Sequence, residues 1–408
     1  MHRPSPSGPG PAIARRGRGG PEAGDIRPRK RPRLRDRLWA RITAALLAVF
    51  LIIVGWSVGH ALTMPGGGSI SERLAEWARG HYLGPVVTFG EWLTYQAPQK
   101  GGKPSFSLAA PSAAAAAKRL KDAQADKFAA LYGPPATLHS LAGKPLKGEG
   151  VWRVLASVNG TPAIYGTYLR ASSVYSSYVA GIASMNQRLL KFQLRPGTED
   201  PGPGHWKASP EITPNSRRGL EATFNSGFKI SVSGGGFYLN GASAGTLAKG
   251  AATVVYYKDG HVAIGAWGQG GLRMTSDVAG VRQNLRPIVV NGKIPASVDN
   301  NVTTSWGATL GGGYYVWRSG IGITRDGRVI FVYGPALNVR ELAQLLKAAG
   351  VVTGMELDIN PDWMSYEYYT AGHHPSNPTP KNLLPTQMQP ANRYYSPASR
   401  DFTAVYAR

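Results

Sequence analysis

The run Val351-Val352-Thr353-Gly354-Met355-Glu356-Leu357-Asp358-Ile359-Asn360 decides how the rest of the chain is interpreted. Its second half alternates, so a strand there places every second side chain, from Met355 to Ile359, on an apolar face. The polar side chains of the opposite face are Glu356, Asp358 and Asn360. Neighbours on that face lie roughly 6.6 Å apart, because each residue advances about 3.3 Å. This pattern suits a site for a cation, a sugar or a phosphate, and it equally suits an edge strand with a solvated face.

The residues before this strand predict a hairpin and a helix. Asp326-Gly327 lies between two apolar runs, and an Asp-Gly pair in that position indicates a tight turn because the turn needs positive φ. Asn338 with Glu341 three residues later has the pattern of a capping box, and the apolar residues that follow recur at helical spacing. Residues 317–363 are therefore predicted to form strand, hairpin, strand, helix and strand.

Length and composition limit the class of protein. A chain of 408 residues exceeds the usual size of one domain, about 100–200 residues. Glycine and aromatic residues are abundant, which favours a turn-rich β protein. The chain has no cysteine, so disulfides, thiolate metal sites, a cysteine nucleophile and a lipidated cysteine are excluded.

From about residue 141 the sequence has β character. Further turn signals separate short runs of Val, Ile, Tyr or Trp; they are Asn159-Gly160, Asp259-Gly260 and Asn291-Gly292. Helices are expected only near 175–182 and 338–349, and a last strand near 402–406. We predict one α+β domain over residues 141–408, built on mixed, twisted sheets with few helices.

Charge and hydropathy divide the N-terminal part of the chain. Residues 1–41 hold eleven Arg and one Lys against three acidic residues, a net charge of +9 that leaves +14 for the rest. Such a Pro-, Gly- and Arg-rich tail is expected to be disordered. Residues 42–64 lack Lys, Arg, Asp and Glu and can cross about 30 Å of hydrocarbon as a helix. We predict a single transmembrane signal anchor, with the tail in the cytoplasm and the C-terminal domain outside it.

Alternatives remain for this part. A basic tail also suits nucleic-acid binding, although we favour the topological role and expect no nucleic-acid partner. A cleaved signal peptide would have a shorter apolar core and a small-residue cleavage site, and no clear A-x-A motif occurs here. Residues 69–96 predict two short amphipathic helices that lie on the membrane surface or dock on the C-terminal domain. Residues 97–140 are interpreted as a linker with a spacer helix.

One local motif suggests a different chemistry. Gly241-Ala242-Ser243-Ala244-Gly245 matches G-x-S-x-G, and a triad of Ser243 with Asp358 and His373 or His374 can be drawn. A nucleophile elbow needs a buried strand before the serine and a helix after it. Glycines precede this match and only a short segment follows it. A serine hydrolase therefore stays as an alternative, below the interpretation that follows.

Several segments in a fixed order resemble the phosphodiester glycosidase domain family. They are Thr223-Phe224-Asn225-Ser226-Gly227-Phe228, Pro287-Ile288-Val289-Val290-Asn291-Gly292, Arg318-Ser319-Gly320-Ile321-Gly322-Ile323, residues 338–346 and Glu356-Leu357-Asp358. The resemblance covers roughly residues 189–362. The basic tail, single span and Gly148-Glu149-Gly150-Val151-Trp152 resemble membrane-anchored bacterial members of the family. At residues 359–363 this chain departs from the family pattern, with Ile-Asn-Pro-Asp-Trp in place of Gly-Gly-Gly-Ser.

The resemblance implies hydrolysis of a sugar-1-phosphodiester at its glycosidic bond. Carried over by position, Asn225, Arg318 and Asp358 would line the active pocket. Arg318 can hold phosphodiester oxygens bidentately. Asp358 can act as acid, base, nucleophile or cation ligand, with Glu356 as second carboxylate. The substrate-binding candidates are Asn225, Asn291 and Asn360.

These expectations define the function prediction. We expect a membrane-anchored hydrolase acting on an envelope glycan or its phosphodiester linkage, with a divalent cation, Ca²⁺ or Mg²⁺, as the one candidate cofactor. The partners would be a glycan or sugar-phosphate substrate and the membrane, contacted through residues 42–64. The first alternative is a catalytically inactive module that binds a glycan or anionic polymer, which the altered strand end favours.

Overall fold

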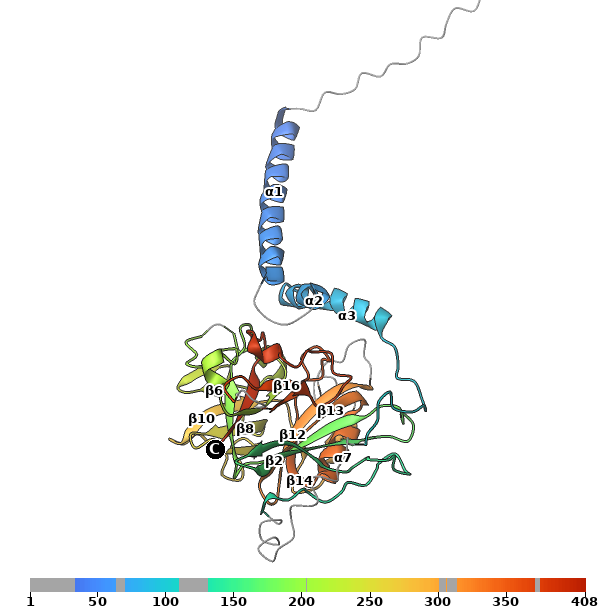
Figure 1. Ribbon diagram of the computed structural model, residues 1–408. Helices are drawn as coiled ribbons and strands as arrows, with labels where there is room; N and C mark the ends of the chain where they lie inside the picture. The colour runs from blue at the N-terminus through green and yellow to red at the C-terminus, as the bar shows by residue number, and fades with distance from the viewer. Residues whose placement is uncertain are drawn as a thin grey trace, which may run out of the picture. The chain divides into compact units, whose positions relative to one another are not determined.

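The computed structural model describes residues 34–63, 70–109, 131–202, 204–300, 306, 314–370 and 375–408 (Figure 1). The chain forms two compact units, Met1–Ser57 and Val58–Arg408. The spacer helix predicted near 113–131 and most of the predicted disordered tail lie outside the described residues.

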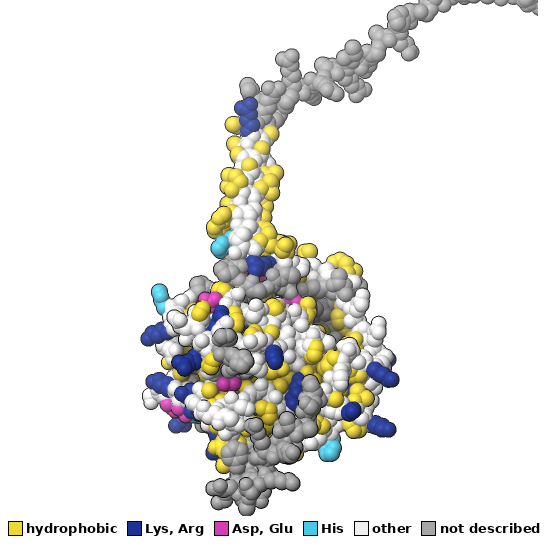
Figure 2. Space-filling model, viewed as in Figure 1, with side chains coloured by type: hydrophobic (Ala, Val, Ile, Leu, Met, Phe, Trp, Pro, Cys, Tyr) yellow, Lys and Arg dark blue, Asp and Glu magenta, His cyan; other side chains and the backbone are white. Residues whose placement is uncertain are grey.

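The first helix, α1 (Leu34–Thr63), has charged residues in its first two turns, and from Ile42 onward it contains no Lys, Arg, Asp or Glu. The most apolar 18-residue segment within Leu38–Thr63 has a mean hydropathy of 2.4 and is not buried, so length and composition suffice to cross a membrane, as they would in a signal sequence. Figure 2 shows hydrophobic side chains along its surface. The helix begins before the predicted start at residue 42, because Leu and Arg are good helix formers and extend it backwards.

Two short helices follow, α2 (Ile70–Gly80) and α3 (Gly84–Thr94). Arg73 Nη1 donates to the carbonyl of Leu62 at 2.7 Å, which ties α2 to the last turn of α1. Just beyond α3, the hydroxyl of Tyr95 donates to the carbonyl of Tyr315 in the β region at 3.2 Å.

The C-terminal region begins with a seven-stranded sheet in the order β1-β2-β3-β13-β12-β14-β11. Its strands are β1 (Arg153–Val158), β2 (Thr161–Leu169), β3 (Ala180–Asn186), β11 (Pro287–Val289), β12 (Val316–Thr324), β13 (Arg328–Leu337) and β14 (Val351–Glu356). The helix α7 (Val339–Ala348) packs against β11, β12, β13 and β14 on one face. The helix predicted near 175–182 is wrong: a turn ends at Tyr178 and β3 begins at Ala180, where small and apolar residues are buried on both faces.

Two five-stranded sheets complete the region. The first, in the order β7-β6-β10-β8-β9, contains β6 (Phe237–Leu239), β7 (Ala242–Ala244), β8 (Ala252–Tyr257), β9 (Val262–Ala266) and β10 (Val278–Gln283). The second, in the order β16-β15-β5-β17-β4, contains β4 (Leu190–Arg195), β5 (Leu220–Asn225), β15 (Tyr366–Thr370), β16 (Thr379–Asn382) and β17 (Phe402–Ala407).

Short helical segments lie in the connections; they are α5 (Ile230–Ser233), η3 (Pro214–Ser216), η4 (Ala296–Asp299) and η6 (Arg393–Tyr395). The predicted α+β class with few helices is confirmed. The sheets were expected to be mixed, whereas the strand pairs in the described ranges run antiparallel. Short turns join many of these strands, and a short turn can only return the chain antiparallel.

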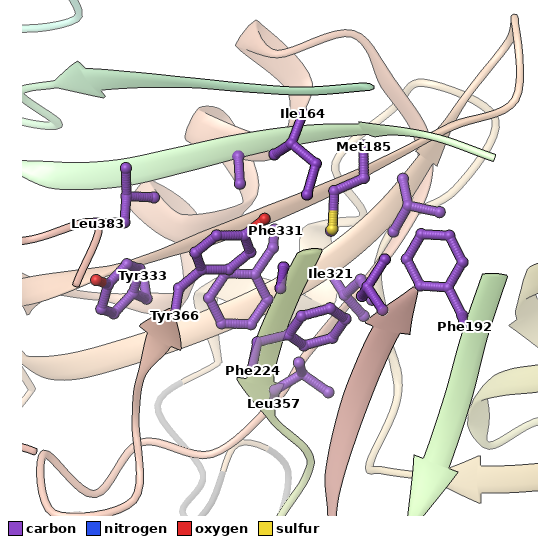
Figure 3. Packing of buried hydrophobic residues seen from close by; sticks show 14 of the residues in the cluster. Ile164, Met185, Phe192, Phe224, Ile321, Phe331, Tyr333, Leu357, Tyr366 and Leu383 are labelled. Carbon is purple, nitrogen blue, oxygen red and sulfur yellow. The ribbon is translucent and has the colours of Figure 1, made fainter. Parts of the chain in front are cut away.

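Alternation along β13 explains how the layers meet. Ile330 and Val332 point into the core beneath α7, whereas Phe331 and Tyr333 point into the core shared by the three sheets. There Phe331 meets Phe224 of β5 with ring centroids 4.9 Å apart (Figure 3). Each fully buried side chain of this size contributes roughly 1.5–3 kcal/mol. The central hydrophobic run of β13 therefore stabilises both layers at once.

The local signals around the central hairpin are confirmed. The Asn338 side chain accepts from the Glu341 amide while the Glu341 side chain accepts from the Asn338 amide, a complete capping box. Gly350 has a φ of 86° just past the end of α7, as expected of a residue that stops a helix. At Gly322 a Cβ would come within 2.3 Å of Val351 Cγ1, so glycine allows β12 and β14 to pair closely.

The Asn-Gly turns and the Asp326-Gly327 turn differ in backbone conformation. Both residues of Asn159-Gly160 and of Asn291-Gly292 have positive φ, as a two-residue hairpin turn requires. In Asp326-Gly327 only the glycine has positive φ, the form of a type I turn followed by a bulge. All three pairs nevertheless reverse the chain where the sequence predicted a reversal.

Candidate active site

A cavity of about 770 Å³ lies where the ends of several strands meet α2, α3 and the segment after α3. Its charged lining residues are Glu76, Arg79, Lys229, Asp358 and Arg400. Much of the remaining lining is aromatic or apolar, and includes Tyr95, Tyr315, Trp317, Ile359 and Trp363. The cavity therefore combines a charged part with an apolar wall.

Asp358 reaches this cavity because β14 ends two residues before it. The Leu357 amide donates to Ser319 at 2.8 Å, and the Asp358 amide donates to the carbonyl of Ser226 at 3.2 Å. The Asp358 carboxylate itself accepts from the Asn360 amide at 2.8 Å. Burial raises the pKa of Asp358 to about 6, and the positive charge of Arg400 opposes that rise. Asp358 can therefore exchange a proton near neutral pH.

Arg400 lies two residues before β17 and lines the cavity. Its Nη2 donates to Glu76, and its guanidinium lies 5.0 Å from the ring centroid of Trp363. Its Nε and Nη1 are buried and have no hydrogen-bond partner among the described residues. Unpaired buried donors on a charged group are costly, so an anion that accepted from them would bind favourably.

Lys229 adds a second positive charge, and a buried cluster fixes its position. Arg282 is fully buried and donates to both carboxylate oxygens of Asp401, at 2.7 and 3.0 Å, and to the carbonyl of Phe228. Asp200 accepts from the Ile230 amide at 3.1 Å. Arg282 and its partners thus hold both the turn that carries Lys229 and Asp401, the residue next to Arg400.

Glu76 of α2 forms ion pairs with both Lys229 and Arg400. Its carboxylate lies 2.5 Å from Lys229 Nζ and also contacts Arg400. Burial would raise the pKa of Glu76, but Arg400 and Lys229 outweigh it, so the net shift is downward. Burial, with the nearby Glu76, raises the pKa of Glu199 to about 7. One carboxylate of this pair is therefore ionised and the other is half protonated near neutrality.

Glu356 and Arg318 do not line the cavity. Arg318 Nη1 lies 2.5 Å from Glu356 Oε1, and its Nε donates to the carbonyl of Leu337 at 2.9 Å. Both side chains are buried, and burial raises the pKa of Glu356 to about 7 despite Arg318. Arg318, which was predicted to hold the phosphodiester, and Glu356, which was predicted to be the second carboxylate, are therefore paired with each other.

The three predicted asparagines lie in different places. Asn225 is buried: its NH₂ donates to Ser226 and Ser319, both at 2.9 Å, and its oxygen accepts from the Ser365 amide. Since Ser319 Oγ donates to the carbonyl of Asp358 at 2.8 Å, Asn225 positions Asp358 through Ser319. Asn360 lines the cavity. Asn291 is exposed in the turn after β11, at the opposite end of β14 from Asp358.

Ser243 lies on β7, an exposed three-residue strand at the edge of its sheet. Residues 245–250 that follow form bends and turns, so the strand–turn–helix of a nucleophile elbow is not built. His373 and His374 lie outside the described residues.

The described residues do not supply a set of ligands for a metal centre. Within the described ranges, no group of three or more His, Cys, Asp or Glu side chains could hold a metal ion. Calcium takes six to eight oxygen ligands and magnesium demands octahedral geometry.

Sequence reasoning missed Lys229 and Arg400, two of the cations that line the cavity with Asp358. Lys229 follows the Asn225-Ser226-Gly227-Phe228 motif directly, and Arg400-Asp401 directly precedes the predicted last strand. The signal that could have found Arg400 is a charged pair beside a strand buried in the middle of a sheet. Its proximity to Asp358 depends on Ser226, whose amide donates to Asp401 at 3.3 Å while its carbonyl accepts from Asp358.

Fold and site together define a β-rich α+β protein with a strand-end cavity suited to an anionic ligand. Residues 218–358 match the family model of the phosphodiester glycosidase domain. No curated protein sequence matches the chain.

Solved structures similar to this chain include the zebrafish N-acetylglucosamine-1-phosphodiester alpha-N-acetylglucosaminidase catalytic domain, auto-inhibited by its pro-peptide. That match has a TM-score of 0.38 and 13% identity and covers 67% of this chain and 94% of that one. A hypothetical protein from Synechocystis matches with a TM-score of 0.34 and 12% identity, over 61% of this chain and 63% of that one.

Proposed function

We propose that the chain hydrolyses the glycosidic bond of a sugar-1-phosphodiester in the cavity that Asp358, Lys229 and Arg400 line. The observation that carries the proposal is the pair of buried Arg400 nitrogens, Nε and Nη1, that have no partner in the described part of the chain, close to a carboxyl with a pKa of about 6. A phosphodiester supplies the acceptor oxygens, and the adjoining sugar places a reactive carbon near the carboxylate. The family match supports the reaction type.

The reaction assigns a role to each charged group. The Asp358 carboxylate accepts a proton from water as the water oxygen bonds to C1 of the sugar. The bond between C1 and the phosphate oxygen breaks, and its electron pair leaves with a phosphomonoester. That leaving group carries about −1.5 to −2 charge at pH 7, so it needs cations more than a proton. Arg400 and Lys229 stabilise the departing charge.

A membrane location belongs to the same proposal. The apolar α1 supports an anchor, and the excess of Arg before it supports a cytoplasmic N-terminus with the catalytic domain outside. Protease treatment of intact cells that express a C-terminal tag checks the orientation: the tag is expected to be digested, and protection would refute it.

The test of the reaction is turnover by the full chain in nanodiscs on glucose-1-phosphodiesters and N-acetylglucosamine-1-phosphodiesters, beside Asp358→Asn. Free sugar and phosphomonoester are expected from wild type only. Binding of these diesters by both proteins without product would favour the alternative, a glycan-binding module. That alternative has one specific observation in its favour, since the predicted second carboxylate Glu356 pairs with Arg318 instead of facing the cavity.

A further inference from the structure

The helices α2 and α3 leave an apolar face uncovered. Large apolar side chains on this pair are solvent-exposed; they are Ile70, Leu74, Leu83, Val86, Phe89 and Leu93. On α3, Val86, Phe89 and Leu93 are each at least 60% exposed, and their spacing places them on one side of the helix. Apolar surface concentrated in this way on a short segment marks an interaction site.

The chain itself indicates what covers this face. At about 1.5 Å per residue, the 26 residues of Leu38–Thr63 extend about 39 Å, beyond the roughly 30 Å of a hydrocarbon core. The last turn of α1 therefore reaches the headgroup region if the helix spans a membrane. Arg73 of α2 donates to Leu62 in that turn, so α2 starts at the same depth. Amphipathic helices at that depth lie in the interface with their apolar side towards the acyl chains.

The opposite side of the same helices forms part of the cavity. Glu76 and Gly84 line it, and Tyr95 to Gln99 just after α3 continue the wall. The wall then passes along Tyr315 and Trp317 towards Asp358 and Arg400. An apolar wall that leads from a membrane-facing helix pair to paired cations suits an amphiphilic anion.

We propose that this cavity takes a sugar-1-phosphodiester whose second ester is a lipid, presented by the membrane on which α2 and α3 lie. The proposal rests on the proposed function for the reaction and extends it to the class of substrate. The phosphodiester sits at Arg400 and Lys229, the sugar at Asp358, and the first part of the lipid chain along the apolar wall. The rest of the chain stays in the bilayer.

The test compares two substrates with the same head group. Full-length protein in nanodiscs is given methyl and hexadecyl diesters of glucose-1-phosphate and of N-acetylglucosamine-1-phosphate, the hexadecyl diester inserted in the lipid. We expect kcat/KM for the hexadecyl diester to exceed that for the methyl diester at least tenfold. Equal turnover of the two overturns the lipid assignment and leaves the glycosidase proposal intact.

A variant locates the effect on the helices. Val86→Ser with Phe89→Ser is expected to lower turnover of the hexadecyl diester about tenfold and leave the methyl diester within about twofold, because membrane binding scales with buried apolar area. Met274→Ser, at an exposed apolar position of the β region, is the matched control and should change neither. An equal loss on both diesters would count against the proposal.

A second measurement decides the case in which neither diester is turned over. The chain has no cysteine, so Phe89→Cys and Met274→Cys each accept a single fluorescent label. We expect the label at position 89 to be quenched by brominated lipid and shielded from iodide, and the label at position 274 to behave in the opposite way. Free access of iodide to position 89 would refute a membrane-bound α3, and with it the proposal.

Discussion

Glu356 and Asp358 lie two residues apart, at the end of β14 and just beyond it, and are used differently. Glu356 pairs with Arg318 inside the protein, whereas Asp358 lines the cavity near Arg400. Both are buried, and both pKa values are raised. The difference teaches that two carboxylates only two residues apart can take different roles, and that the contacts of each one decide whether it is structural or chemical.

The largest expected effect comes from breaking the structural pair. Arg318→Ala should lower the free energy of unfolding by about 3–5 kcal/mol, because it leaves Glu356 buried without its partner. Urea or thermal unfolding of the full chain measures the change. Arg340→Ala, which removes an exposed pair with Asp299, is the control and should change the free energy of unfolding far less. A stability unchanged by Arg318→Ala would show that the pair is not structural.

Breaking the other arginine should affect turnover instead. Arg400→Gln is expected to lower kcat/KM about 10- to 150-fold, since a hydrogen bond to a charged group contributes about 1.5–3 kcal/mol. Steady-state kinetics on the diester panel check it, with Arg340→Gln as the control expected to leave the rate unchanged. Wild-type kinetics in Arg400→Gln would show that this arginine does not bind the phosphate.

The pH dependence sharpens the role of Asp358. Its pKa of about 6 means that below pH 6 the carboxyl is mostly protonated and cannot accept a proton from water. We expect kcat/KM to be about tenfold lower at pH 5 than at its plateau above pH 7, in step with the protonated fraction. A rate that falls as pH rises through 6 would make Asp358 the proton donor instead.

The smallest expected effect concerns Glu76, which is paired with both Lys229 and Arg400. Glu76→Gln removes its charge, so a phosphodiester meets less competition at Lys229 and Arg400. We expect KM to fall severalfold, up to about tenfold, with kcat little changed. Kinetics of Asp299→Asn, an acidic residue paired with an arginine elsewhere, provide the comparison. A higher KM in Glu76→Gln would mean that Glu76 helps to bind substrate.

Local patterns predicted much of the fold. Asn338 and Glu341 form the capping box that their spacing indicates, and the Asp326-Gly327 turn joins the two central strands. These features depend on residues close in sequence, so one chain suffices to predict them. The solvated-face alternative for Glu356 and Asp358 is wrong, because both side chains are buried: Glu356 pairs with Arg318, and Asp358 lies in the wall of the cavity.

The candidate site was predictable only in part, because some of its residues come from segments that are far apart in the sequence. Asp358 was recognised from its own strand, but Arg400 comes from the C-terminal end of the chain and Lys229 from a turn after β5. Their meeting depends on Arg282, whose bonds to Asp401 and Phe228 hold both segments. No local pattern encodes contacts between residues so far apart in the sequence.

The most direct test exchanges each carboxylate for its amide, as Asp358→Asn and Glu356→Gln, and measures kcat and thermal unfolding of both proteins. The account predicts that Asp358→Asn lowers kcat about 10²–10⁴-fold with little change in Tm. It predicts that Glu356→Gln keeps most of its kcat and lowers the free energy of unfolding by about 1–3 kcal/mol, because Arg318 loses a charged partner. The opposite pattern, with kcat lost in Glu356→Gln and kept in Asp358→Asn, would contradict the account.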